Sequence, residues 1–172
     1  MSKENLSLMA QYNIWATQRL SVSLEKVSDE DFYKDVGLYF KSIFGTLNHL
    51  LVGEHYLWYP RFAERISPNL KLNDVIEEDR SLCLTQLRQK SQQWIAFIEA
   101  LDDGRLQGSL SYTRVNGEQL TLPFMPTLFH VFNHGTHHRG QITAAMTAMG
   151  YECPELDLVY MLAEIERHQK QH

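Results

Sequence analysis

Four long stretches of the chain repeat apolar residues every three or four positions, and this repeat limits the possible folds more than any other feature. In the first stretch the apolar side includes Leu6, Met9 and Leu20. The four stretches cover residues 5–26, 42–59, 74–102 and 125–149. Four amphipathic helices bury their apolar faces against one another, so we expect an all-α fold, a four-helix bundle.

Capping and breaking residues predict where these helices begin and end. Ser28, followed by acidic residues in "SDEDF", predicts the start of a short helix after the first long one. Pro60 is expected to end or kink the second long helix, and Asn73 to cap the third. Gly150 is expected to close the fourth.

The segment 109–122, "SLSYTRVNGEQLTL", has a different character from the helical stretches. Tyr, Thr, Val and Leu surround the pair Asn116-Gly117, which suits a type I′ turn because both residues tolerate positive φ. We therefore expect a small β-hairpin before the last long helix. After that helix, Leu158, Met161 and Ile165 predict a short C-terminal helix.

Length and composition predict one ordinary globular domain over residues 1–172. The net charge of −5 argues against a nucleic-acid partner, because such partners are bound largely through lysine and arginine. The sequence has neither an apolar amino-terminal run nor about 18 consecutive apolar residues, so we expect no membrane partner and a cytoplasmic location. Cys83 and Cys153 are too few for a disulfide framework.

The chemistry of the sequence is concentrated in "HVFNHGTHHRGQ", residues 130–141, which holds four of the eight histidines. On a helix, successive residues are turned by about 100°, so His130, His134 and His138 share one face and His137 lies to its side. His134 and His138 are one turn apart and could direct their ring nitrogens at one ion, about 2.0 to 2.1 Å from each.

A functional metal site needs a further ligand from another helix, and His49 is the candidate. Small neighbours at helical spacing, including Gly45 and Gly53, would let a second helix approach it. His55 is turned by about 240° from His49 and could not share the site. Glu54, at about 140°, lies on another face as well, so no general base can be assigned.

Other readings of these residues stay open. Clustered histidines also occur as core residues that hydrogen-bond one another without a metal. We expect His130 to support the site rather than bind the ion, and His137 to pair with the backbone or a carboxylate. His168 and His172 are expected to be solvated. Arg139 could bind an anionic substrate or form a salt bridge between helices.

Four segments resemble the DinB family in the same order along nearly the whole chain. They are "YNIWATQRL", "TLNHLLVGEHYLW", "HVFNHGTHHRGQITAAMTAMG" and "ELDLVYML", and the element H-x-x-H-H-R-G-Q is the most specific part. The resemblance implies a DinB/YfiT-like bundle of up-down-down-up type that carries a divalent metal, usually zinc or nickel, on three histidines. By motif position these are His49, His134 and His138. It also implies a homodimer.

The same superfamily includes bacillithiol and mycothiol S-transferases and a thiol-dependent maleylpyruvate isomerase. We therefore expect a divalent-metal-dependent enzyme that acts on a small-molecule substrate. It would be a low-molecular-weight-thiol S-transferase, with the thiol as a cofactor, or a hydrolase. The alternative is a non-catalytic, metal-binding, stress-associated protein that acts as a dimer. The sequence identifies no catalytic residue beyond the metal ligands.

Overall fold

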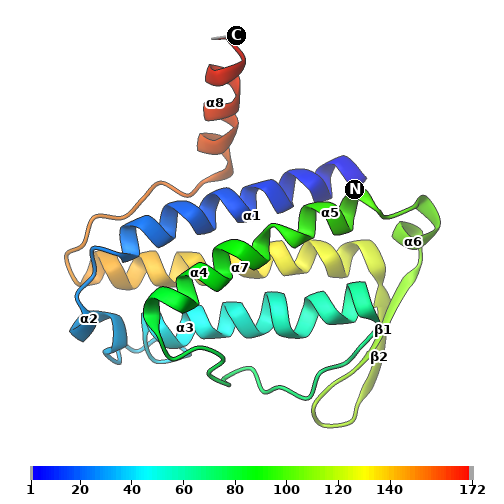
Figure 1. Ribbon diagram of the computed structural model, residues 1–172, viewed down its shortest axis with the longest axis horizontal. Helices are drawn as coiled ribbons and strands as arrows, with labels where there is room; N and C mark the ends of the chain where they lie inside the picture. Colours follow the sequence, from blue (N-terminus) through cyan, green and yellow to red (C-terminus); the bar gives the residue numbers. More distant parts are fainter. Residues whose placement is uncertain (1, 171–172) are drawn as a thin grey trace.

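A computed structural model describes residues 2–170, and four long helical rods form its body (Figure 1). The rods are α1 (Lys3–Leu24); α3 (Ile43–Leu50), which continues as η1 (Leu51–Trp58) and η2 (Pro60–Glu64); α4 (Arg80–Ser91) with α5 (Gln93–Glu99); and α7 (Phe124–Ala148). The shorter elements are α2 (Asp29–Tyr33), α6 (Asp103–Gln107), β1 (Ser109–Thr113), β2 (Gln119–Pro123) and α8 (Leu158–Gln169).

The directions of the four rods follow the expected order. In Figure 1, α1 and α7 run one way along the bundle, whereas α3 with η1 and α4 with α5 run the other way. The topology is therefore up-down-down-up, and the predicted four-helix bundle is confirmed. α1 packs against α4, α5 and α7, and α3 packs against α4 and α7. The crossover that joins the two parallel rods, residues 65–79, runs along the outside of the bundle.

The core consists of the apolar faces that the periodicity predicts. One buried cluster contains Leu24, Phe32, Ile43 and Ile142, and a second surrounds the fully buried Trp94. Burial of each such side chain is worth about 1.5 to 3 kcal/mol relative to exposure.

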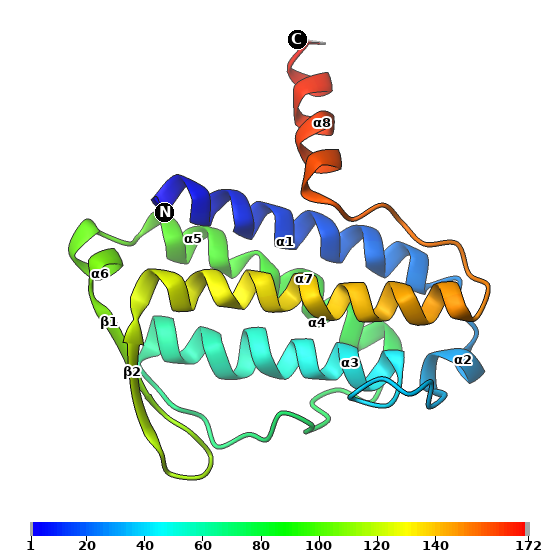
Figure 2. The ribbon, with the colours of Figure 1, turned by 180° about the vertical axis from the view of Figure 1, so that it is seen from behind.

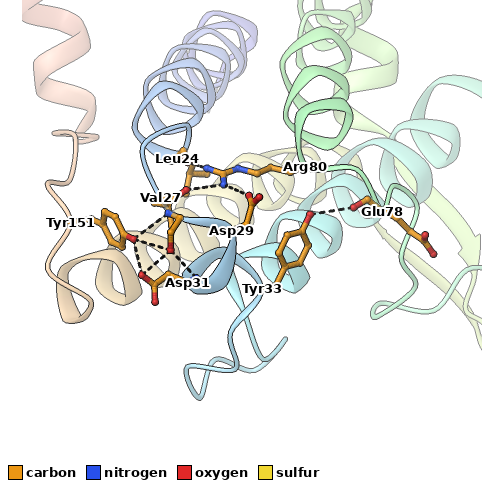
Figure 3. Close-up of polar contacts among 9 residues, drawn as sticks. Leu24, Val27, Asp29, Asp31, Tyr33, Glu78, Arg80 and Tyr151 are labelled. Atoms are coloured by element: carbon orange, nitrogen blue, oxygen red, sulfur yellow. Dashed lines mark hydrogen bonds and ion pairs between the residues drawn. The ribbon is translucent and has the colours of Figure 1, made fainter.

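Polar contacts hold the end of the bundle near α2 (Figure 3). Arg80, at the start of α4, donates hydrogen bonds to the carbonyl oxygens of Leu24 and Val27, and pairs with Asp29 at 2.9 Å. Tyr151, which follows α7, donates to Asp31 at 2.7 Å. These contacts satisfy carbonyl groups that the end of α1 leaves free, and they join three rods at one end.

The second rod does not end at Pro60, which is one of the two outcomes that the sequence predicts there. The backbone continues through Pro60 in a π-helix. The rod ends only at Arg65, whose φ is +59°. In an α-helix a proline ring clashes with the carbonyl four residues earlier, and a π-turn spaces its hydrogen bonds more widely. The widened rod therefore extends one turn further and includes Arg61.

The third rod begins later than predicted, and Asn73 does not cap it. Asp79 is the cap, and its side chain accepts a hydrogen bond from the backbone N–H of Leu82. The segment before Asp79 is bound by a residue of another rod. The buried side chain of Asn48, on α3, accepts hydrogen bonds from the N–H groups of Ile76 and Glu77. A tertiary contact thus competes with helix formation there.

The hairpin is present, but its turn is of another type. β1 and β2 pair antiparallel from Ser109–Pro123 to Thr113–Gln119. Within the turn, the N–H of Gly117 donates to the carbonyl of Arg114, and Gly117 alone has positive φ, at +85°. This is a three-residue loop with a glycine bulge rather than a two-residue type I′ turn, because Asn116 keeps negative φ.

The last helix, α8, projects from the body in both ribbon views (Figures 1 and 2). Met161 is buried against α1, and Trp15 on α1 donates a hydrogen bond to Glu164 at 2.8 Å. Within residues 2–170, no helix combines the length and the apolar character needed to cross a lipid bilayer.

Candidate metal centre

Three histidine side chains converge between two rods, one from α3 and two from α7. The Nε2 atom of His134 lies 3.0 Å from that of His49 and 3.1 Å from that of His138. In a tetrahedral site with nitrogen ligands about 2.0 to 2.1 Å from zinc, ligand atoms are separated by roughly 3.3 Å. The three nitrogens are therefore spaced nearly as three ligands of one ion would be.

Hydrogen bonds to the other ring nitrogens orient two of these imidazoles. The Nδ1 atom of His49 lies 2.8 Å from the carbonyl oxygen of Leu72, and that of His138 lies 2.7 Å from Oε1 of Gln141. Both partners are acceptors, so each Nδ1 carries the proton and each Nε2 presents a lone pair. Such outer partners typically fix the tautomer of metal-binding histidines.

Electrostatics keeps the cluster neutral. Burial is the largest cause that lowers the pKa of each imidazole, to about 3 for His134 and to about 4 for His138. Burial also lowers the pKa of His49. In His134 the neighbouring histidines add to this effect, because like charges would repel one another. Neutral imidazole is the form that binds a metal ion.

Close packing brings the two rods together at this point. A Cβ atom on Gly53 would lie 3.4 Å from Cε1 of His134, so the His134 ring approaches the second rod closely at this small residue. The ring of Phe40 stacks on His49, with the ring centroids 3.8 Å apart. Gly45 allows this contact, since a side chain there would overlap the Phe40 carbonyl oxygen.

The cluster opens into a cleft of about 810 Å³, which is large enough for a small molecule. Its walls come from the rods α3–η2 and α7, the crossover segment, the tip of the hairpin and residues 39–40. The lining residues are Tyr39, Phe40, His49, Leu57, Trp58, Arg61, Leu70, Lys71, Leu72, Tyr112, Arg114, Val115, Asn116, His130, His134 and His138.

The other histidines take different positions. His130 lines the cleft beside the cluster, with its ring centroid 5.6 Å from that of His134, which agrees with a supporting place. His137 is exposed and forms no hydrogen bond within residues 2–170, so the expected backbone or carboxylate partner is not found there. His55 is buried away from the cluster, as predicted. His168 is exposed, whereas His172 lies outside the described residues.

Within residues 2–170, Arg139 neither lines the cleft nor forms a salt bridge between helices. It is buried on the opposite side of α7, where it donates a hydrogen bond to the side chain of Asn13. Asn13 in turn donates to Glu54 at 2.8 Å. Burial raises the pKa of Glu54, and the Arg139 charge opposes that rise. Glu54 therefore stabilises the packing of three rods and does not line the cleft.

Sequence reasoning missed several residues that shape the site. Gln141 had a signal, because it lies three positions after His138 on the histidine face. Phe40, the carbonyl of Leu72 and Arg61 had none, since their positions depend on loops and on the π-helical extension. Three aromatic side chains of the first two long helices take different positions. Trp58 lines the cleft. Trp15 donates a hydrogen bond to Glu164, and Tyr56 donates one to Gln86.

The fold and the histidine cluster together define a class of proteins. These are up-down-down-up four-helix bundles with three imidazoles from two neighbouring rods directed at one point. The chain belongs to the DinB family, whose model matches residues 1–169. The family resemblance seen in the sequence is thereby confirmed.

Two relatives from Bacillus subtilis agree with this assignment. The chain is 26% identical to Protein DinB of strain 168 over 159 residues, which is 86% of this chain and 87% of the relative. Its fold is similar to that of YfiT, with a TM-score of 0.67 and 18% sequence identity, over 88% of this chain and 91% of YfiT.

Proposed function

We propose that the chain is a divalent-metal-dependent enzyme that binds its ion through His49, His134 and His138. One observation carries the proposal: His49 and His138 both direct an Nε2 lone pair at Nε2 of His134. A proton on His134 Nε2 could satisfy only one of these lone pairs, whereas a cation would satisfy all three nitrogens. Zinc and nickel are both commonly bound by imidazole.

Such an ion would supply Lewis-acid activation of a substrate, a water molecule or a thiol at the coordination positions that protein ligands leave open. The protein would contribute the rest. Leu72 and Gln141 hold the imidazoles of His49 and His138 in the binding tautomer. Phe40 covers one face of His49, and the open side of the cluster faces the cleft, where a substrate would bind.

Hydrolysis is the reaction that we propose first. YfiT, which shares the fold, is described as "a probable metal-dependent hydrolase". The test uses protein prepared without a polyhistidine tag, stripped by a chelator and reloaded with zinc or nickel. It would be screened against esters, amides and phosphoesters. Turnover that requires the metal and is lost in His134→Ala supports the proposal, and turnover that survives this substitution contradicts it.

Transfer of a low-molecular-weight thiol is a second candidate, and the composition of the cleft favours it. Within residues 2–170, no aspartate or glutamate lines the cleft, so these residues place no acidic general base there of the kind a hydrolase often uses. A thiol needs less help, because a bound cation lowers its pKa directly. The same protein assayed with an electrophile and glutathione, bacillithiol or coenzyme A would detect this activity.

Inactivity in both screens, with metal still bound, would favour the non-catalytic, stress-associated alternative.

We also propose that two copies associate as a homodimer through α8. On that helix Val159 is 62% exposed and Leu162 40% exposed, while Met161 is buried against α1. Sedimentation of the purified chain, compared with Val159→Asp, tests this association.

The outer partner of His138 provides a milder test of the site. Gln141→Leu removes the acceptor of the His138 Nδ1 proton, so the ring loses its fixed tautomer and orientation. We expect the zinc affinity to fall by about 10- to 100-fold while the fold is retained. Gln141→Glu keeps an acceptor at the same place and should preserve the affinity. Competition with a chromogenic chelator measures both, and equal affinities for Gln141→Leu and wild type would contradict the prediction.

A further inference from the structure

Arg61 is a buried cation that has no counter-ion among the described residues. Its residue surface is 7% exposed, and its Nε atom has no hydrogen-bond partner in the part of the chain that the structure describes. Within residues 2–170, no carboxylate lies within 4.0 Å of its guanidinium group. A buried charge without a hydrogen-bonded partner is costly, so this arrangement requires a reason.

Two aromatic rings hold the guanidinium group in place. Its central carbon lies 4.8 Å from the ring centroid of Trp58 and 4.4 Å from that of Tyr112. Cation–π contacts of this kind offset part of the desolvation cost. They engage the faces of the rings, however, and within residues 2–170 the buried Nε–H donor at the edge of the guanidinium is left without an acceptor. The rings therefore orient Arg61 without satisfying it.

Arg61 lines the same cleft as the histidine cluster. A row of side chains connects the two: the ring of His134 lies 5.6 Å from that of His130, and His130 lies 5.6 Å from Trp58, which contacts Arg61. One elongated small molecule could thus reach both places. The lining of this cleft also includes Leu57 and the exposed Val115 near the hairpin tip, which are apolar.

The charge of the cleft is also one-sided. Lys71 and Arg114 line it together with Arg61, and no acidic side chain of the described residues does, although the whole chain carries a net charge of −5. Arg114 is partly neutralised by Glu118 at 2.9 Å. Burial lowers the pKa of Arg61; Tyr112 opposes that shift, and the positive charge of Arg114 adds to it. An anion bound between these side chains would offset the desolvation cost of the buried Arg61 charge. It would also reduce the repulsion between Arg61 and Arg114.

We propose that Arg61, fixed between Trp58 and Tyr112, binds an anionic group of the substrate, either a carboxylate or a phosphate. The guanidinium edge matches the two oxygens of such a group. This inference rests on the proposed function, because it takes the bound molecule to be the substrate of the histidine site. The substrate class is then a small molecule with an anionic end and an apolar middle, whose other end reacts at the cluster.

Binding of simple probes tests the anion site without any assay of turnover. Benzoate and phenylphosphonate each carry one anionic group on an apolar ring, and benzamide is the neutral counterpart. Each is titrated into the full chain in chelator-stripped and zinc-loaded form. The observable is the indole N–H signal of Trp58 in a nitrogen-15 spectrum, which reports on the immediate neighbour of Arg61. Comparison of the two anions distinguishes a carboxylate site from a phosphate site.

Three variants distinguish specific binding of the anion by Arg61 from a general effect of positive charge on the protein. Arg61→Gln should weaken binding of the preferred anion by about 10- to 100-fold, the usual worth of hydrogen bonds to a charged group. Arg61→Lys should weaken it less, because the charge stays while the two-pronged contact is lost. Arg167→Gln, on α8, removes the same charge at a residue that does not line the cleft and should change nothing. Circular dichroism confirms that each variant is folded.

The outcomes distinguish this inference from the proposed function. Anion binding that depends on Arg61 supports the subsite even if the chain holds no metal, in which case the proposed function alone fails. Equal binding by wild type and Arg61→Gln overturns the subsite, as does equal binding of benzamide. If Arg61→Gln is unfolded, Arg61→Lys decides: unchanged affinity and unchanged preference between the two anions contradict a two-pronged contact.

Discussion

Replacement of His134 by alanine is expected to reduce bound zinc from about one ion per chain to about a tenth of that or less. His134 is the central member of the cluster, since its Nε2 lies within 3.1 Å of both other Nε2 atoms. Two imidazoles alone hold zinc weakly, so the site needs its third ligand. Loss of a hydrogen-bond partner of a ligand can cost roughly 100-fold in zinc affinity, and loss of the ligand His134 itself should cost more. Elemental analysis of tag-free protein measures the stoichiometry.

The matched control is His137→Ala on the same helix. His137 is exposed, and its ring is 4.9 Å from that of His138, but it directs no nitrogen at the cluster. Zinc content should therefore remain at the wild-type level. Full zinc content in His134→Ala, or equal loss in both variants, would show that the ion is not held where we propose.

The second large effect is expected for Gly135→Ala, immediately after that histidine. A Cβ atom there would lie 2.5 Å from Oε1 of Glu54, 2.8 Å from Oδ1 of Asn13 and 2.9 Å from Nη1 of Arg139. All three are buried and belong to one hydrogen-bonded chain, so none can move without breaking a bond. Steric overpacking and a lost buried hydrogen bond together should lower the free energy of unfolding by about 3 kcal/mol.

Gly140→Ala is the control for this prediction. Gly140 lies on α7 as well, but within residues 2–170 no atom beyond its neighbours and the adjoining backbone of its own helix would lie within 4 Å of its Cβ. The substitution should stabilise the chain by about 0.5 to 1 kcal/mol, because alanine has the higher helix propensity. Denaturant unfolding measures both variants. The interpretation is wrong if Gly135→Ala is as stable as Gly140→Ala.

The helical part of the fold was predictable because it depends on local periodicity. The apolar repeats located four rods, and Ser28 and Gly150 marked two boundaries that the structure retains. The cap of the third rod was not predictable. Asn73 and Asp79 are both acceptable caps by residue type, and the choice is made by Asn48, which holds Ile76 and Glu77 from another rod.

The histidine cluster shows the same division. Spacing along α7 placed His134 and His138 together, because a helix has a fixed turn. The selection of His49 used the small neighbours at Gly45 and Gly53 and the family motif, and the structure brings its nitrogen to the pair. The orienting contact from Leu72 had no local signal, since a backbone carbonyl has the same chemistry at every residue.

The sequence by itself determined the bundle, the hairpin and the histidine face of one helix, because each follows from the periodicity or the turn chemistry of neighbouring residues. The tertiary structure alone decided how far the second rod extends beyond Pro60, where Arg61 lies and which groups close the cleft around the imidazoles. Those features depend on contacts between residues far apart in the chain, and the free energy of such contacts is defined only once the rods have packed.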